Sequence, residues 1–229
     1  MSIKPILTTT LLYILCSTSF ASSPSQANPK HVELFNTRNF CVVCTLNGAE
    51  LSPDTLYDGV HYNANLSASY VYGTTMDRLD LTFAFLYAIK GEYFTIKNSK
   101  VRLINITYSD LPYFTFTNNE GNLVNFTGSG LNYGNFQGAQ LDDVIFTQTS
   151  LVETDLSNTN FKRALFNGAL IYDSNFTNAE LTYADFTNAS LKNVNFTRAN
   201  LLGAKISKEQ LAQANVCEAV MPDGTRGNC

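Results

Sequence analysis

Large apolar residues recur at every fifth position over the C-terminal half of the chain. Between residues 126 and 211, all eighteen positions of this phase hold Phe, Leu or Ile. They are Phe126, Leu131, Phe136, Leu141, Phe146, Leu151, Leu156, Phe161, Phe166, Ile171, Phe176, Leu181, Phe186, Leu191, Phe196, Leu201, Ile206 and Leu211. Helices repeat every 3.6 residues and strands every 2, so neither element explains a five-residue period. The pattern therefore predicts a chain that turns a corner in each unit and coils back upon itself.

Small residues form a second column, two positions before each large one, as in Ala164, Ala169 and Ser174. The remaining three positions of each unit are mostly polar, often with Asn or Asp just before the large residue. A tightly wound coil needs a large side chain at its centre and a small one where its walls converge. We therefore expect the large and small columns to face inward and the other positions to face solvent.

This unit, Ala-(Asp/Asn)-(Leu/Phe)-x-x, resembles the pentapeptide-repeat family, with close matches at Ala179-Glu180-Leu181, Ala184-Asp185-Phe186 and Ala199-Asn200-Leu201. The resemblance implies an all-β fold, a right-handed quadrilateral β-helix in which four units make one square coil of twenty residues. The chain supports this coil length independently, because the segment 93–98 (YFTIKN) returns as 113–118 (YFTFTN) after twenty residues.

The five-residue register extends back to about Cys41, with Gly121, Gly91 and His61 as exceptions. We therefore predict a β-helix over 41–215, with between eight and nine coils and a length of about 40 Å. Ser207 and the residues after it favour a short terminal helix, and residues 216–229 are expected to form a C-terminal cap. His61 is expected to be strained or turned outward. Bulky residues at small positions predict distorted corners or a bulged face over 79–121.

Residues 1–27 are typical of a bacterial export signal, with Lys4, an apolar stretch over 6–16, and cleavage sites after Ala21 or Ala27. This apolar stretch is too short to span a bilayer, so the mature chain is expected to have no transmembrane span. An uncleaved leader stays an alternative. Lipid attachment at Cys16 is a weaker one, because Leu15 stands where such motifs have a small residue. Residues 28–40 are expected to be a flexible segment.

Four cysteines remain after the leader, one pair near each end of the predicted coil. Four cysteines allow three pairings, but the two pairs lie about 40 Å apart, beyond the reach of a disulfide. We therefore predict Cys41 with Cys44 and Cys217 with Cys229, which staple the ends of the solenoid in an oxidising compartment. Both terminal cysteine motifs also resemble those of exported bacterial members of the family, which favours a periplasmic or secreted protein.

The chain offers no recognisable catalytic constellation. Its two histidines, His31 and His61, have no assignable nucleophile, and Asp142-Asp143 lacks motif spacing and is expected to be a solvated turn. No phosphate-binding loop occurs, and too few residues lie outside the coils for a second core. We therefore predict a protein that is not an enzyme and that has no cofactor or metal site.

The most suggestive surface feature is aromatic. Tyr93, Tyr113 and Tyr133 lie twenty residues apart, so in a square coil they form one column on one face. Such a column either recognises a partner or a glycan ring, or simply stabilises neighbouring coils, as cross-strand pairs do in sheets.

Two functions follow from these observations. The first is a rigid, exported scaffold that presents a patterned surface to an unknown protein or envelope partner, with homodimer formation left open. The alternative comes from the family resemblance: some members imitate DNA, bind type II topoisomerases and protect them from quinolones. Nucleic acid itself is not an expected partner. After loss of Lys4, nineteen acids face fourteen bases, and a net charge of about −5 is weak for a mimic of DNA.

Overall fold

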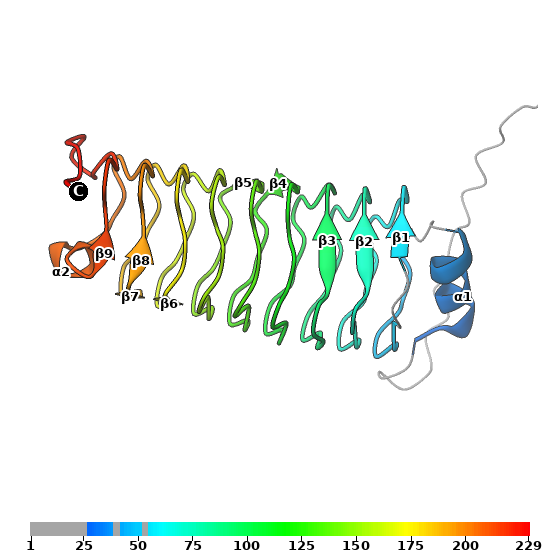
Figure 1. Cartoon of the computed structure of the whole chain (residues 1–229). Coiled ribbons are helices and arrows are strands. Elements are labelled where there is room, and N and C mark those ends of the chain that lie inside the picture. Colours follow the sequence, from blue (N-terminus) through cyan, green and yellow to red (C-terminus); the bar gives the residue numbers. More distant parts are fainter. Residues whose placement is uncertain (1–26, 39–41, 52–54) are drawn as a thin grey trace, which may run out of the picture.

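The protein forms a straight rod of stacked square coils, capped by a helix at one end and by a helix and tail at the other (Figure 1). This computed structural model describes residues 27–38, 42–51 and 55–229. Most of the predicted signal peptide, including Ala21, and the predicted disulfide residue Cys41 lie outside the described residues. The architecture is the right-handed quadrilateral β-helix that the family resemblance implies.

Short strands lie in the walls of the coils, and each pairs in parallel with a strand of a neighbouring coil. Three of them form one sheet: β1 (Thr55–Tyr57), β2 (Thr75–Asp77) and β3 (Thr95–Lys97). The others pair in twos: β4 (Glu120–Asn122) with β5 (Gln140–Asp142), β6 (Leu170–Tyr172) with β7 (Ser190–Lys192), and β8 (Val194–Asn195) with β9 (Ala214–Asn215). Each parallel pair joins residues twenty apart, and so do the isolated parallel bridges from Thr45 to Val220. The coil therefore has twenty residues throughout and makes between eight and nine turns.

The corners explain why the chain turns every five residues. The second residue after each large one from Leu56 to Leu201 has a left-handed backbone, and the non-glycine examples have φ between 53° and 62°. This conformation lets the next unit close a turn, as when the Ala169 N–H donates to the Phe166 carbonyl at 3.0 Å. Left-handed backbone is unfavourable for most L-residues. The interior packing and the ladder hydrogen bonds of every coil must offset that cost.

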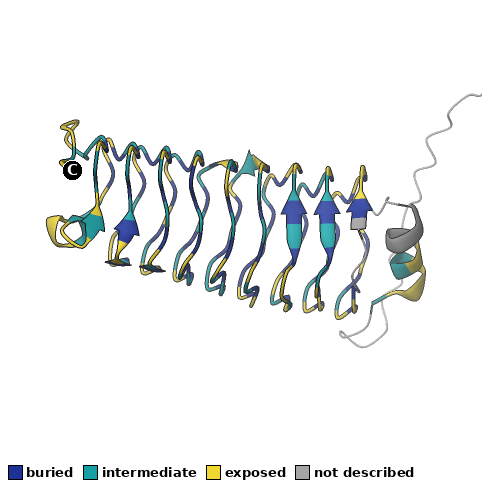
Figure 2. Ribbon diagram, in the orientation of Figure 1, coloured by how far each residue is buried: buried dark blue, intermediate teal, exposed yellow. Residues whose placement is uncertain are grey.

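The core is a set of stacked side-chain columns along the rod axis, and burial follows the inner wall of each coil (Figure 2). Phe126, Phe146, Phe166 and Phe186 form one column, with ring centroids 5.1, 5.2 and 4.7 Å apart and nearly parallel planes. These four rings and Leu131, the core residues expected from the repeat, are fully buried. Since the centroid spacing matches the rise of stacked strands, identical positions stack directly.

The structure corrects two expectations for the N-terminal half. His61 was expected to turn outward or be strained, but its side chain is fully buried at the position that Leu81 holds one coil later. The stretch over 79–121 was expected to be distorted, yet its twenty-residue register is unbroken. Its bulky residues turn inward, and the Phe94 and Phe114 rings stack at 5.5 Å. Glycine at two large positions of this stretch leaves the interior volume that these rings fill.

The N-terminal end also differs from the expectation. The segment 28–40 was expected to be flexible, but it contains helix α1 (Pro29–Arg38). The Asn28 N–H donates to the Thr45 carbonyl at 3.2 Å, the Thr45 N–H donates to His31 Nδ1 at 3.1 Å, and Val32 packs against the core. These contacts place α1 over the open end of the first coil.

At the C-terminal end, helix α2 (Lys208–Leu211) confirms the predicted terminal helix. Ser207 and Gln210 form a reciprocal capping box, and Gln210 also donates to the carbonyls of Phe186 and Ala189 at 2.8 and 2.7 Å. The coil then continues to Val220, so it ends later than the predicted boundary at 215. Because α2 replaces one wall, Ile206 and Leu211, expected in the core, are only partly buried.

Candidate interaction surface

One corner of the rod carries the tyrosine column expected from the sequence. Tyr93, Tyr113 and Tyr133 occupy the left-handed corner position in three successive coils. Because the coil repeats every twenty residues, the backbone places the three side chains directly over one another.

The three rings stack face to face. The Tyr93 and Tyr113 centroids are 4.9 Å apart with planes at 13°, and those of Tyr113 and Tyr133 are 5.1 Å apart with planes at 18°. The side chains remain 51%, 42% and 46% exposed. The ring faces are therefore covered by neighbouring rings, whereas the ring edges form a continuous strip along the corner.

Tyr72 closes the N-terminal end of this strip. Its ring meets Tyr93 edge to face, with centroids 6.3 Å apart and planes at 90°. Beside it lies a surface recess lined by Tyr70, Tyr72, Lys90, Gly91, Glu92, Asp110 and Pro112. Gly91 has no room for a side chain, because an added Cβ would lie 2.8 Å from the Val71 carbonyl carbon. The backbone here approaches the preceding coil closely.

Carboxylates continue the column beyond Tyr133. Glu153 and Asp173 occupy the same corner position in the next two coils, and with Thr154, Asp155 and Asn175 they line an open recess. Asn193 Nδ2 donates to Asp173 at 2.9 Å, and the Ser157 N–H donates to Asp155 at 3.0 Å. Within the described chain, Glu153, Asp155 and Asp173 form no ion pair. The recess therefore brings together negatively charged carboxylates that no basic side chain neutralises, and it lies next to the strip of aromatic ring edges.

Several other acidic side chains of the rod are paired with bases. Arg163 holds both Asp142 and Asp143, at 3.1 and 2.7 Å, so this acidic pair is an ion-pair partner rather than the freely solvated turn expected from the sequence. The hydrogen bond from Arg163 lowers the pKa of Asp143 below its ordinary value. Similar pairs join Asp58 to Arg78, Glu218 to Arg198 and Asp185 to Lys205.

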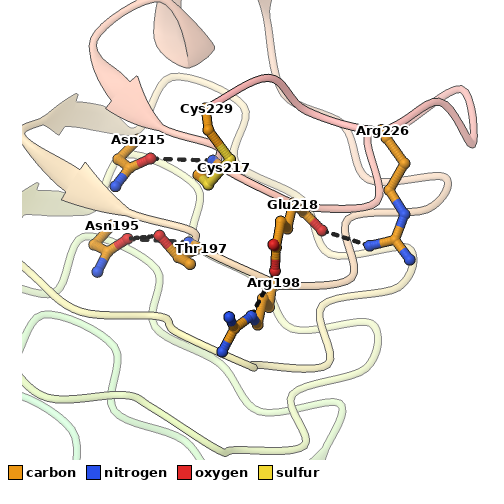
Figure 3. The surroundings of a disulfide bond; sticks show 8 residues. All are labelled: Asn195, Thr197, Arg198, Asn215, Cys217, Glu218, Arg226 and Cys229. Carbon is orange, nitrogen blue, oxygen red and sulfur yellow. Dashed lines mark hydrogen bonds and ion pairs between the residues drawn. A yellow bond between two sulfur atoms is a disulfide. The ribbon is translucent and has the colours of Figure 1, made fainter.

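The C-terminal cap contains the disulfide expected between Cys217 and Cys229 (Figure 3). Asn215 accepts a hydrogen bond from the Cys217 N–H at 3.0 Å, and Arg226 donates to the Glu218 carbonyl at 2.7 Å. The disulfide thus pins the tail across the last coil. At the other end Cys44 is also disulfide-bonded, but its predicted partner Cys41 lies outside the described residues.

The two histidines lie in different parts of the structure. His31 lies in α1 and His61 in the core, and burial lowers the pKa of His61 to about 4. In the part of the chain that the structure describes, no three His, Cys, Asp or Glu side chains are grouped to hold a metal ion. The described helices include none with the length and apolar character that a membrane span requires.

The sequence analysis identified the tyrosines of this corner but missed Tyr72, Glu153 and Asp173. The two acids could have been found by extending the twenty-residue offset beyond Tyr133. Tyr72 could not, because it lies one position before the column and its contact depends on the orientation of its ring.

The comparisons with known proteins agree with this architecture. Residues 139–216 match the family model described as "Pentapeptide repeat region". No curated protein sequence matches the chain.

Solved structures with the same kind of repeat are also similar. HetL, a pentapeptide repeat protein involved in heterocyst differentiation regulation in the cyanobacterium Nostoc, is 19% identical over 79% of this chain and 92% of its own, with a TM-score of 0.33. A pentapeptide repeat protein of the Arabidopsis thaliana thylakoid lumen is 26% identical over 49% and 72%, with a TM-score of 0.38. A trypsin-treated variant of QnrB1, a plasmid-mediated fluoroquinolone resistance protein, is 20% identical over 72% and 85%, with a TM-score of 0.39. The five-residue repeat, the four-sided coil and the family match over 139–216 together identify a pentapeptide repeat region in this chain.

Proposed function

We propose that this protein is an exported, non-enzymatic scaffold, a rigid rod whose outward-facing columns bind a protein in the bacterial envelope or outside the cell. The observation that carries this proposal is the unbroken twenty-residue register from Thr45 to Val220. With this register, the large and small positions of each unit lie in the core, and the side chains that face solvent are held at regular spacings along the rod. A surface of this kind suits recognition rather than turnover.

Rigidity is supported by hydrogen bonds between coils beyond the ladder. Hydroxyls in the small column donate to carbonyls of the preceding coil: Ser109 to Leu86 at 3.0 Å, Ser129 to Ile106 at 2.7 Å and Thr149 to Phe126 at 2.9 Å. Buried carbonyls paired in this way resist local opening. The rod therefore acts as a spacer of about 40 Å.

Export is supported by the leader-like residues 1–27 and by the disulfide between Cys217 and Cys229. Disulfides persist in oxidising compartments and are rare in the cytosol. A covalent staple at the end of a solenoid is useful where no cytosolic chaperone protects a fraying end.

The alternative, a DNA mimic that binds type II topoisomerase and protects it from quinolones, has less support. A mimic needs rows of unpaired acids along the rod. Here Asp58, Asp143, Asp185 and Glu218 are each held by a base. A net charge of about −5 after loss of the leader leaves a weak field around the rod.

The decisive experiment is the intact mass of the protein isolated from its native cells, with and without reduction, together with cell fractionation. We expect a chain that begins near Ser22 or Asn28, lies outside the cytoplasm, and is about four mass units lighter than its reduced form because it holds two disulfides. Chemical crosslinking in the same cells should then yield a complex with another protein or a homodimer. A full-length, reduced, cytoplasmic chain would refute the proposal and make topoisomerase binding the next test.

A further inference from the structure

We propose that the ridge formed by Tyr93, Tyr113 and Tyr133, together with the recess around Glu153 and Asp173, binds an extended segment of a partner protein that carries apolar and basic residues. This inference rests on the proposed scaffold function, and it specifies where on the rod the partner lies and what chemistry it presents.

The stacking geometry limits what the ridge can bind. Because the Tyr93, Tyr113 and Tyr133 rings are about 5 Å apart and nearly parallel, each covers the face of its neighbour. A flat ligand such as a sugar ring or a nucleic-acid base therefore has no access to the faces between the rings. The exposed edges and phenol hydroxyls instead offer a narrow apolar strip with hydrogen-bonding groups, which suits the side chains of an extended peptide.

Tyr133 is the exception within the ridge. Tyr113 covers one of its faces, and among the described residues no ring stacks on the other. The next residue of the column is Glu153, one coil further along the same corner. A basic side chain that lies over the exposed edge of this corner is attracted both by the Tyr133 ring and by the Glu153 carboxylate, so this position favours Arg or Lys.

The recess beyond Tyr133 strengthens the selection for positive charge. Glu153, Asp155 and Asp173 line it without a basic partner, whereas acids on other corners are held by Arg78, Arg163 and Arg198. Hydrogen bonds from Asn193 to Asp173 and from Asn175 to Asp155 orient these carboxylates but leave their charge uncompensated. The missing counter-charge is what a basic partner would supply.

The spacing along the rod fits an extended chain. From Tyr93 to Glu153 the column rises by three coils, about 14 Å at the spacing of stacked strands. An extended peptide covers this length in about four residues. One basic residue at the recess and apolar residues on the ridge can therefore be engaged together by a single short segment.

The test measures the binding of short fluorescein-labelled peptides to the purified, oxidised full-length mature protein by fluorescence anisotropy at physiological ionic strength. The probe alternates leucine and arginine, and two reference peptides replace either arginine by glutamate or leucine by serine. Variant Glu153→Gln/Asp173→Asn removes the charge of the recess, and Tyr133→Asn removes the open ring. Asparagine tolerates the left-handed backbone, as Asn193 shows in the same column.

Matched control variants lie away from this ridge. Tyr183→Asn removes an exposed tyrosine that has the equivalent left-handed backbone on a different corner, offset by half a coil, and Glu120→Gln removes an exposed acid from another wall. Far-UV circular dichroism of each variant establishes that the β-helix is intact before binding is compared.

We expect the leucine–arginine peptide to bind, the double acid variant to weaken binding about tenfold and Tyr133→Asn about threefold, and both control variants to change it by less than twofold. Equal binding of the glutamate peptide, or equal loss in the ridge and control variants, would overturn the inference. So would an absence of binding by the leucine–arginine peptide. Localisation and partner crosslinking are measured separately. If the protein is exported and crosslinks to a partner through another part of the rod, the scaffold function stands and only the proposed binding surface is refuted.

Discussion

The buried histidine makes the stability of the rod depend on pH in a window where few other groups titrate. His61 is fully enclosed in the core, and desolvation lowers its pKa from the ordinary 6.5 to about 4. In the unfolded chain the imidazole takes up a proton near pH 6.5, whereas the folded protein resists protonation until about pH 4. Between these values the unfolded state binds more protons, so lowering the pH favours unfolding.

The magnitude follows from the two pKa values. Each pH unit in this interval is worth about 1.4 kcal/mol, so the free energy of unfolding should fall by about 2 kcal/mol between pH 6.5 and pH 5. It should fall by about 3 kcal/mol in all by pH 4. Carboxylates with lowered pKa values, such as those of Asp143 and Glu218, contribute stability that is lost only near and below pH 4. The interval from pH 5 to 6.5 therefore isolates histidine.

The assay is urea unfolding followed by far-UV circular dichroism at several pH values between 5 and 7.5, with midpoint and slope both reported. His61→Leu is the test variant, because Leu81 fills the equivalent core position one coil later. Its stability should fall by about 2 kcal/mol less than that of the parent over this interval. Hydrogen exchange of peptides around residue 61 identifies local opening, which matters because solenoids can unfold in parts.

His31 supplies the matched control. It lies in α1, where its Nδ1 accepts a hydrogen bond from the Thr45 N–H. His61 is the one histidine that remains in His31→Gln, so the fall in stability of this variant between pH 6.5 and 5 measures the contribution of His61 alone. If the parent and His61→Leu lose stability equally between pH 6.5 and 5, then His61 is not a neutral core residue and the reasoning is wrong.

Three further predictions concern packing and the cap. Phe166→Ala should lower the free energy of unfolding by about 3 to 5 kcal/mol, because the ring is fully buried between two parallel rings at 5.2 and 4.7 Å; chemical denaturation measures this, and stability equal to the parent would contradict the column. Replacing Cys217 and Cys229 together by Ser should lower the free energy of unfolding by about 2 to 4 kcal/mol and speed amide hydrogen exchange in the tail. Unchanged exchange would show that the other contacts of the tail are sufficient to hold it. Gly121→Ala should lower the thermal midpoint, because the added Cβ would lie 2.9 Å from the Val101 carbonyl carbon; an unchanged midpoint would mean that the coils shift without cost.

The fold was predictable from the sequence because a solenoid repeats the same local problem. Each large residue, such as Phe146, packs on the residues twenty positions before and after it, so the five-residue pattern specifies inward and outward positions coil by coil. The short helix after Ser207 was predictable for the same reason, since its capping box with Gln210 involves only neighbouring residues. The tyrosine column followed from the offset of twenty alone.

The tertiary structure decided what depends on partners that the local pattern does not specify. Helix α1 has no strong signal of its own and is ordered by docking on the open first coil through Thr45 and the core contact of Val32. His61 turns inward although it is polar, because its backbone follows the column that Leu81 continues. Whether the tyrosine rings expose their faces or only their edges depends on side-chain rotamers. Burial periodicity thus determines the architecture from sequence, whereas the end caps and the chemistry of the surface depend on which side chains meet once the coils are stacked.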